Sequence, residues 1–215
     1  MDKENVLNRR IYDVSKVSEI IEIILISLGV FLVPLVIPQL LNALFGAKSV
    51  ISSNSQFIVG AIVNTALIIA GINAKGWKKI ISVITLPSLS AIASGLIFTT
   101  PSSIYTVYMI PFIWIGNFAI VYLYKYLYVS KKMNYIVASV ISIITKGIAI
   151  FAGFNLLLVL NVIPKGSKIA MALTSAMGIN QIITAVIGSI LAFTILKTSY
   201  RKNVWVYGIR PKKEK

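Results

Sequence analysis

The stretch "YIVASVISIITKGIAIFAGFNLLLVLNV", residues 135 to 162, decides the class of fold. It is apolar over more than the roughly 20 residues that a helix needs to cross a bilayer, and such runs are typical of transmembrane helices rather than of a soluble core. A single charged residue, Lys146, interrupts the run. We therefore predict a membrane-spanning helix with an ammonium group inside it.

The rest of the chain follows the same pattern. Of its 215 residues 57% are hydrophobic, the mean hydropathy is +0.87, and the apolar residues come in long blocks. This composition predicts an all-α integral membrane protein. Pro34 and Pro38 lie inside the first block, so we expect that helix to be kinked or broken there. The six predicted spans are residues 17–44, 57–72, 80–98, 105–124, 135–162 and 171–196.

Basic residues predict the orientation of these spans. If the N-terminus is cytoplasmic, 17 lysines and arginines lie in cytoplasmic segments and only Lys48, Lys165 and Lys168 lie outside. Cytoplasmic loops carry such an excess, so we expect a multi-pass protein of the cell membrane with both termini in the cytoplasm. The segments are then a cytoplasmic N-terminal stretch (1–16), a transmembrane domain (17–196) and a basic cytoplasmic tail (197–215). Aromatic residues that suit the inner interface are Trp77, Tyr122, Tyr124, Tyr126 and Tyr128.

The composition also excludes several function classes. The chain has no cysteine and no histidine, which removes disulfides, thiolate or imidazole metal sites and the usual nucleophile and base pairs. It has no P-loop motif for ATP. We therefore predict no catalytic residue, no metal and no cofactor. The net charge of +15 is better explained by anionic lipid headgroups beside the spans than by nucleic acid.

Lys146 is the one basic residue that the topology leaves unexplained. It lies about 18 Å along its helix, near the bilayer midplane, where a lysine costs roughly 2.5 to 3.5 kcal/mol and should face protein or water. Ser139, Ser142 and Gly153 share its helical face, and no acid of the sequence lies at its depth. Two explanations remain. Lys146 meets the anionic group of a ligand, or it is neutral or donates to carbonyls freed by a proline in another span.

Other polar residues form stripes on two spans. Gln56, Gly60 and Asn64 share one face of the second span, while Gln181, Thr184, Gly188 and Ala192 share one face of the sixth. Small residues at this spacing favour close helix packing. The amides of Gln56, Asn64, Asn117 and Gln181 need hydrogen-bond partners in lipid, which can be other helices or a ligand.

Prolines are frequent in the third and fourth spans. Pro87, Pro101 and Pro111 are expected to break the helical ladder, and Gly116 with Asn117 suggests a joint in the middle of a span. Non-helical backbone at this depth survives where it is buried or lines a cavity. We therefore expect a cavity that opens to the outer side.

Two motifs in this region resemble a known family. "LPSLSAIASG" (86–95) and "PFIWIGN" (111–117), in a six-span chain with cytoplasmic ends, are similar to the substrate-binding (S) component of energy-coupling-factor vitamin transporters. The likeness covers roughly residues 56 to 192 and points to Pro87, Gly95, Pro111, Gly116 and Asn117 as family-like positions. It departs from the family in its first span, which has no A-x-x-x-A face. Ala66 and Ala70 have that spacing, but on the second span.

The resemblance implies a subunit that captures a vitamin or similar micronutrient and docks on a transmembrane coupling subunit with two ATPases. The aromatic and amide side chains suit a planar heterocycle, and Lys146 suits a carboxylate or phosphate. The predicted substrate-binding residues are Lys146, Gln56, Asn64, Asn117, Gln181, Ser142 and Trp114. The predicted helix-packing or partner residues are Gly60, Ala66, Ala70, Gly95, Gly188 and Ala192.

Two alternatives stay open. A self-sufficient secondary transporter or channel for a small solute is one, although ion-coupled carriers usually have intramembrane carboxylates. A membrane enzyme or a scaffold subunit is the other, and the missing histidine, cysteine and mid-span acids weaken its enzyme half.

Overall fold

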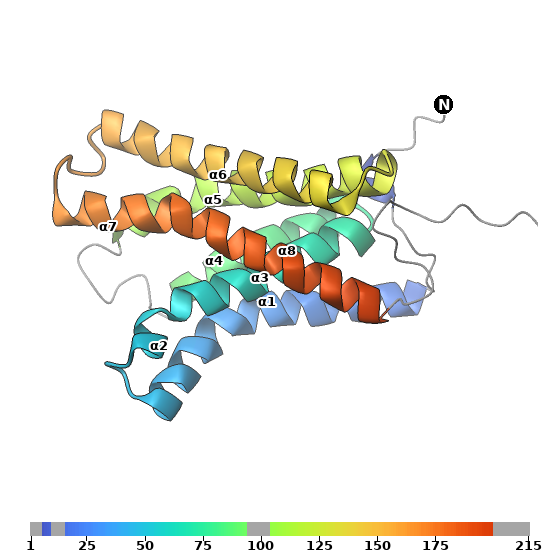
Figure 1. The fold of residues 1–215 in the computed structure, drawn as a ribbon, viewed down its shortest axis with the longest axis horizontal. Helices are drawn as coiled ribbons and strands as arrows, with labels where there is room; N and C mark the ends of the chain where they lie inside the picture. The colour runs from blue at the N-terminus through green and yellow to red at the C-terminus, as the bar shows by residue number, and fades with distance from the viewer. Residues whose placement is uncertain (1–5, 10–15, 94–103, 200–215) are drawn as a thin grey trace, which may run out of the picture.

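The fold is a bundle of long helices, seen in a computed structural model that describes residues 6–9, 16–93 and 104–199. No strand occurs among these residues. Figure 1 shows the long helices side by side, with their axes along the length of the molecule. The elements are η1 (Val6–Asn8), α1 (Lys16–Phe45), α2 (Val50–Ser53), α3 (Ser55–Asn73), α4 (Trp77–Ala93), α5 (Ile104–Leu123), the π-helix η3 (Tyr124–Ser130), α6 (Tyr135–Val159), α7 (Lys168–Met177) and α8 (Ile179–Ser199).

The prediction of a multi-pass, all-helical membrane protein is confirmed in its main part. Within the described ranges, five helical segments are long and apolar enough to cross a bilayer: Ile23–Phe45, Ser55–Asn73, Tyr105–Ser130, Tyr135–Val159 and Lys168–Thr198. The predicted span 80–98 corresponds to α4, of which the structure describes Trp77–Ala93. The count of six spans and the cytoplasmic position of both termini stay predictions.

Two predicted spans differ in detail from the observed helices. The span predicted at 171–196 consists of α7 and α8, which meet at Gly178, the residue that caps α7. The span predicted at 105–124 continues as the π-helix η3 as far as Ser130. Its extra length carries Lys125 and several tyrosines, whose polarity hides the helix from a hydropathy pattern.

The predicted break in the fourth span is wrong. α5 runs as one α-helix through Pro111, Gly116 and Asn117, and α4 runs through Pro87; Pro101 lies outside the described residues. A Cβ on Gly116 would lie 2.6 Å from Ile150 Cγ1 of α6, so this glycine serves close packing and is not a joint.

The first span is also one continuous helix. α1 runs through Pro34 and Pro38, and Figure 1 shows it bending before it reaches α2.

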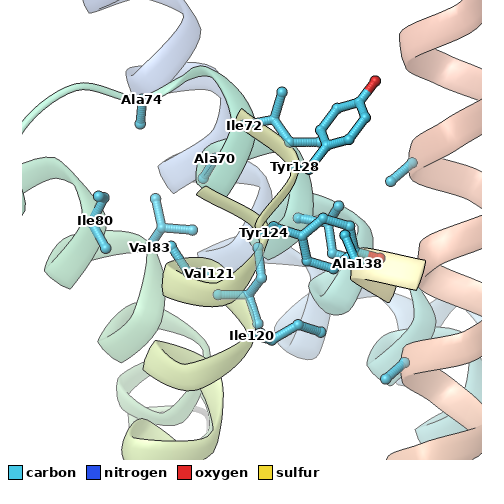
Figure 2. Close-up of a cluster of buried hydrophobic side chains, with 14 of the residues drawn as sticks. Ala70, Ile72, Ala74, Ile80, Val83, Ile120, Val121, Tyr124, Tyr128 and Ala138 are labelled. Atoms are coloured by element: carbon cyan, nitrogen blue, oxygen red, sulfur yellow. The ribbon is translucent and has the colours of Figure 1, made fainter. Parts of the chain in front are cut away.

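The main core lies where α3, α4, α5 and η3 meet. Ala70 and Ile72 of α3, Val83 of α4 and Val121 of α5 are fully buried there, and Figure 2 shows Tyr124 and Tyr128 in the same cluster. Leucines and isoleucines on the outer faces of α1, α6 and α8 are exposed, as lipid-facing side chains are in a membrane protein. This arrangement leaves the few buried polar groups inside the bundle.

Candidate functional site

Lys146 lies at the centre of the candidate site. It lies in the middle of α6, only 3% of its side chain is exposed, and its Nζ donates a hydrogen bond to Oδ1 of Asn64 over 2.5 Å. Within the described part of the chain this is the hydrogen bond that the ammonium makes. The partner is therefore a side-chain amide, and not a carbonyl freed by a proline.

Asn64 connects Lys146 to two more helices. Its Nδ2 donates to the carbonyl of Gly60 at 2.8 Å and to Oγ1 of Thr184 at 3.2 Å. Both donor bonds orient the amide so that its oxygen faces α6. Asn64 and Thr184 are 2% and 5% exposed. The site is thus built from α3, α6 and α8 and is closed from solvent.

Two glycines make this junction possible. A Cβ on Gly60 would lie 2.8 Å from Thr184 Cγ2, and a Cβ on Gly188 would lie 2.6 Å from Asn64 Cβ and 2.9 Å from the Ala61 carbonyl. α3 and α8 therefore touch through their backbones. Thr65 reinforces the contact, because its Oγ1 bonds the carbonyls of Ala61 and Gly188 at 2.8 and 3.2 Å.

Two further buried polar atoms, on α6 and α5, make no hydrogen bond within the described residues. Ser142 is one helical turn before Lys146 on the same face of α6, and its Oγ is fully buried with no hydrogen-bond partner among the described residues. Nε1 of Trp114 in α5 is also buried and has no partner in that part of the chain. Buried polar groups normally have partners, so each unused donor needs an explanation.

Three predicted amide positions lie away from this centre. Asn117 is 2% exposed, and its Nδ2 donates to the carbonyl of Ile84 in α4 at 3.4 Å. Gln56 is exposed at the start of α3. The Nε2 of Gln181 donates to the carbonyl of Ala176 at 3.2 Å and ties α8 to α7. Of the four amides, only Asn64 contacts Lys146.

The predicted packing residues have separate places. Gly60 and Gly188 lie in the α3–α8 contact described above, and Ala70 and Ala192 are completely buried. Ala66 is half-buried and lines a shallow groove of about 280 Å³ between α1 and α3. Gly95 lies outside the described residues.

A larger groove of about 400 Å³ runs between α6 and α8. It is lined by Tyr135, Ser139, Ile143, Val186 and Phe193, among others. Neither this groove nor the one between α1 and α3 includes Lys146. The residues around Lys146 close over it, and the outward cavity expected from the prolines is not formed by these two grooves.

Sequence reasoning missed a second buried lysine. Lys125 is completely buried in η3, and its Nζ donates to the carbonyls of Ala74 and Arg9, each at 2.6 Å. The sequence pattern places it among the 17 cytoplasmic charges, because it follows an apolar run. The tyrosines on both sides of it, Tyr124 and Tyr126, were a signal that the helix continues.

A buried hydroxyl network was also missed. Oη of Tyr124 lies 2.7 Å from Oγ of Ser139 and 2.9 Å from Oγ of Ser189, while Oη of Tyr135 donates to the Ser189 carbonyl at 2.8 Å. The assignment of Tyr124 and Tyr128 to an interfacial aromatic belt is wrong, because they are 0% and 1% exposed. They point into the bundle instead, as Figure 2 shows for both rings.

Comparison with known proteins gives no assignment. No family model, no curated protein and no solved structure matches this chain.

Proposed function

We propose that this chain is a membrane-embedded subunit that captures a small micronutrient, a vitamin or vitamin-like compound with an anionic group, for uptake. In this proposal it works with a separate coupling subunit and ATPase subunits, as the resemblance implies. Its own sequence has no ATP-binding loop, so any energy comes from a partner or a gradient. The motifs similar to vitamin-transporter S components support this assignment.

The observation that carries the proposal is that Lys146 is buried at the centre of the bundle and makes one hydrogen bond within the described residues. The ammonium has three N–H groups and makes one hydrogen bond, to Asn64, while Ser142 Oγ has no partner among the described residues. The sequence has no acid between Glu22 and Glu214 that could supply a counter-charge. A carboxylate or phosphate has the acceptors that such a site needs.

Substrate capture requires the bundle to open. Lys146 is 3% exposed and Asn64 is 2% exposed, so a ligand cannot reach either of them in the closed arrangement. Movement of α6 away from α3 and α8 would expose the ammonium and release it from Asn64. The incoming anion would then accept the hydrogen bond that Lys146 donates to the Asn64 oxygen in the closed bundle.

The test starts from protein purified with its natural ligand. Mass spectrometry of the small molecule released on denaturation identifies the ligand, and calorimetry then measures its affinity for each variant. Lys146→Gln is expected to weaken binding by about 1 kcal/mol or more, the value of a hydrogen bond to a charged group, while leaving expression intact. Lys131→Gln, at an exposed lysine, serves as the control.

Two results would overturn the proposal. Unchanged affinity in Lys146→Gln would remove the ligand role of the ammonium. Uptake into liposomes by the isolated chain, without ATP or other subunits, would instead indicate a self-sufficient carrier.

A further inference from the structure

The groove between α6 and α8 forms a second site. Its walls come from the first half of α6 and the second half of α8, which draw apart toward this end of the bundle in Figure 1. Exposed side chains at its rim, such as Val140 (51%) and Ile190 (61%), lie where lipid-facing residues are expected. The groove therefore opens sideways, toward the acyl chains of the bilayer.

The lining of this groove offers no free polar group. Oγ of Ser139 accepts from Tyr124 and donates to the Tyr135 carbonyl, at 2.7 Å each. Oγ of Ser189 lies 2.9 Å from Tyr124 Oη and 3.0 Å from Ser139 Oγ. Because these hydroxyls bond one another, they do not require a polar occupant, and the remaining surface is aliphatic and aromatic. The groove suits a hydrocarbon chain.

A basic residue, Lys197, lies at one end of the groove. The Nζ of Lys197 lies 5.8 Å from the ring centroid of Phe193, a lining residue one helical turn earlier. Lys131 and Lys132, just before the start of α6, are exposed at the same end of the bundle. From Tyr135 to Ile143 the α6 wall extends about 12 Å, long enough to hold much of an acyl chain. Apolar length and terminal positive charge match the two parts of an anionic phospholipid.

We propose that the α6–α8 groove binds one acyl chain of an anionic phospholipid whose headgroup phosphate meets Lys197. The site is separate from the Lys146 centre and does not depend on the function proposed for that centre. The chemistry is of two kinds: dispersion and hydrophobic contact along the chain, and charge attraction of a basic residue for the headgroup.

The experiment is native mass spectrometry of the full chain in detergent, with matched phosphatidylglycerol and phosphatidylcholine as probes. The wild-type protein should retain one phosphatidylglycerol in preference to phosphatidylcholine. Lys197→Gln should reduce that preference about five-fold, the effect of one basic residue near an anionic surface. Lys78→Gln, an exposed lysine at the start of α4, should leave the preference unchanged.

A second pair of variants tests the apolar part. Val140→Phe fills the groove from its rim, whereas Val137→Phe places the same ring on an exposed position of α6 outside the lining. We expect Val140→Phe to lower lipid retention at least three-fold and Val137→Phe to leave it unchanged. If Val140→Phe fails to fold, Val186→Phe fills the groove from the α8 wall.

Three outcomes would overturn the inference. Equal retention of the two lipids would exclude headgroup recognition by Lys197. Equal retention by Val140→Phe and Val137→Phe would show that the bound lipid lies elsewhere on the surface. A dimer in the wild-type spectrum that Val140→Phe dissociates would assign the groove to a second copy of the chain.

Discussion

The ammonium of Lys146 in α6 lies 2.5 Å from the side-chain oxygen of Asn64 in α3, and the same amide donates to Thr184 in α8. One asparagine thus holds three helices together at the buried centre of the bundle. Because both of its ends are occupied, any change at Asn64 affects the lysine and the α3–α8 contact at once. The stability of the bundle and the chemistry of the candidate site are coupled through this side chain.

Removal of the amide is expected to destabilise the protein through the lysine it leaves behind. In Asn64→Leu the buried ammonium loses its acceptor, which should lower the free energy of unfolding by about 2 kcal/mol. Denaturant unfolding in detergent micelles, followed by tryptophan fluorescence, measures this change. Gln56→Leu is the matched control, since Gln56 is an exposed amide on the same helix.

The double variant isolates the contact itself. When Asn64→Leu is combined with Lys146→Met, no unpaired ammonium remains, and most of the lost stability should return. A double variant whose loss equals the sum of the two single losses would contradict a direct coupling between these residues.

Gly188 should tolerate no added carbon. The Cβ in Gly188→Ala would lie 2.6 Å from Asn64 Cβ and 2.9 Å from the carbonyl of Ala61, and neither atom is the end of a flexible side chain. The helices must separate, so we expect a loss of about 1 to 3 kcal/mol in the free energy of unfolding. Gly29→Ala in α1 meets no atom within 4 Å, so the same unfolding assay should show no loss of stability or a small gain. Equal effects of the two substitutions would argue against a tight α3–α8 contact.

Lys125 is expected to hold the start of the chain against the bundle. Its Nζ bonds the carbonyl of Arg9 and the end of α3 at Ala74, while the amide of Gly76 donates to the Leu7 carbonyl at 3.0 Å. Lys125→Met removes the first pair of bonds, so trypsin should cleave after Arg9 several-fold faster. Mass spectrometry of the released N-terminal peptide over time measures the rate. In the control variant Lys131→Met, which changes an exposed lysine, trypsin should cleave after Arg9 at the wild-type rate.

How far the sequence predicts this structure depends on the kind of interaction. Apolar runs predicted the positions of α3, α5 and α6 because hydrophobic length alone determines a span. The burial of Lys125 escaped prediction because it depends on carbonyls of distant segments, Arg9 and Ala74. In the same way, the small polar face of α6 indicated that Lys146 points inward, but nothing local identified Asn64, 82 positions away, as its partner.

The clearest separation of stability from function is expected at two serines of α6. Oγ of Ser139 takes part in the hydroxyl network with Tyr124 and Ser189, whereas Oγ of Ser142 is buried without a partner in the described part of the chain. Ser139→Ala should therefore lower the free energy of unfolding by about 1 kcal/mol, because it removes the hydrogen bonds that Ser139 Oγ makes to Tyr124 and Ser189. Ser142→Ala removes an unsatisfied hydroxyl, so the ligand-free protein should be as stable as the wild type or slightly more stable.

If the Ser142 hydroxyl bonds the ligand, the variant with the larger effect on binding should be Ser142→Ala, whereas Ser139→Ala has the larger effect on stability. Ser142→Ala should weaken calorimetric binding of the anionic ligand by about 1 kcal/mol, the value of one hydrogen bond, while Ser139→Ala should change it little. A residue that costs stability without a ligand and contributes affinity with one has a functional role rather than a packing role. Wild-type affinity in Ser142→Ala would instead mean that this hydroxyl takes no part in the ligand site.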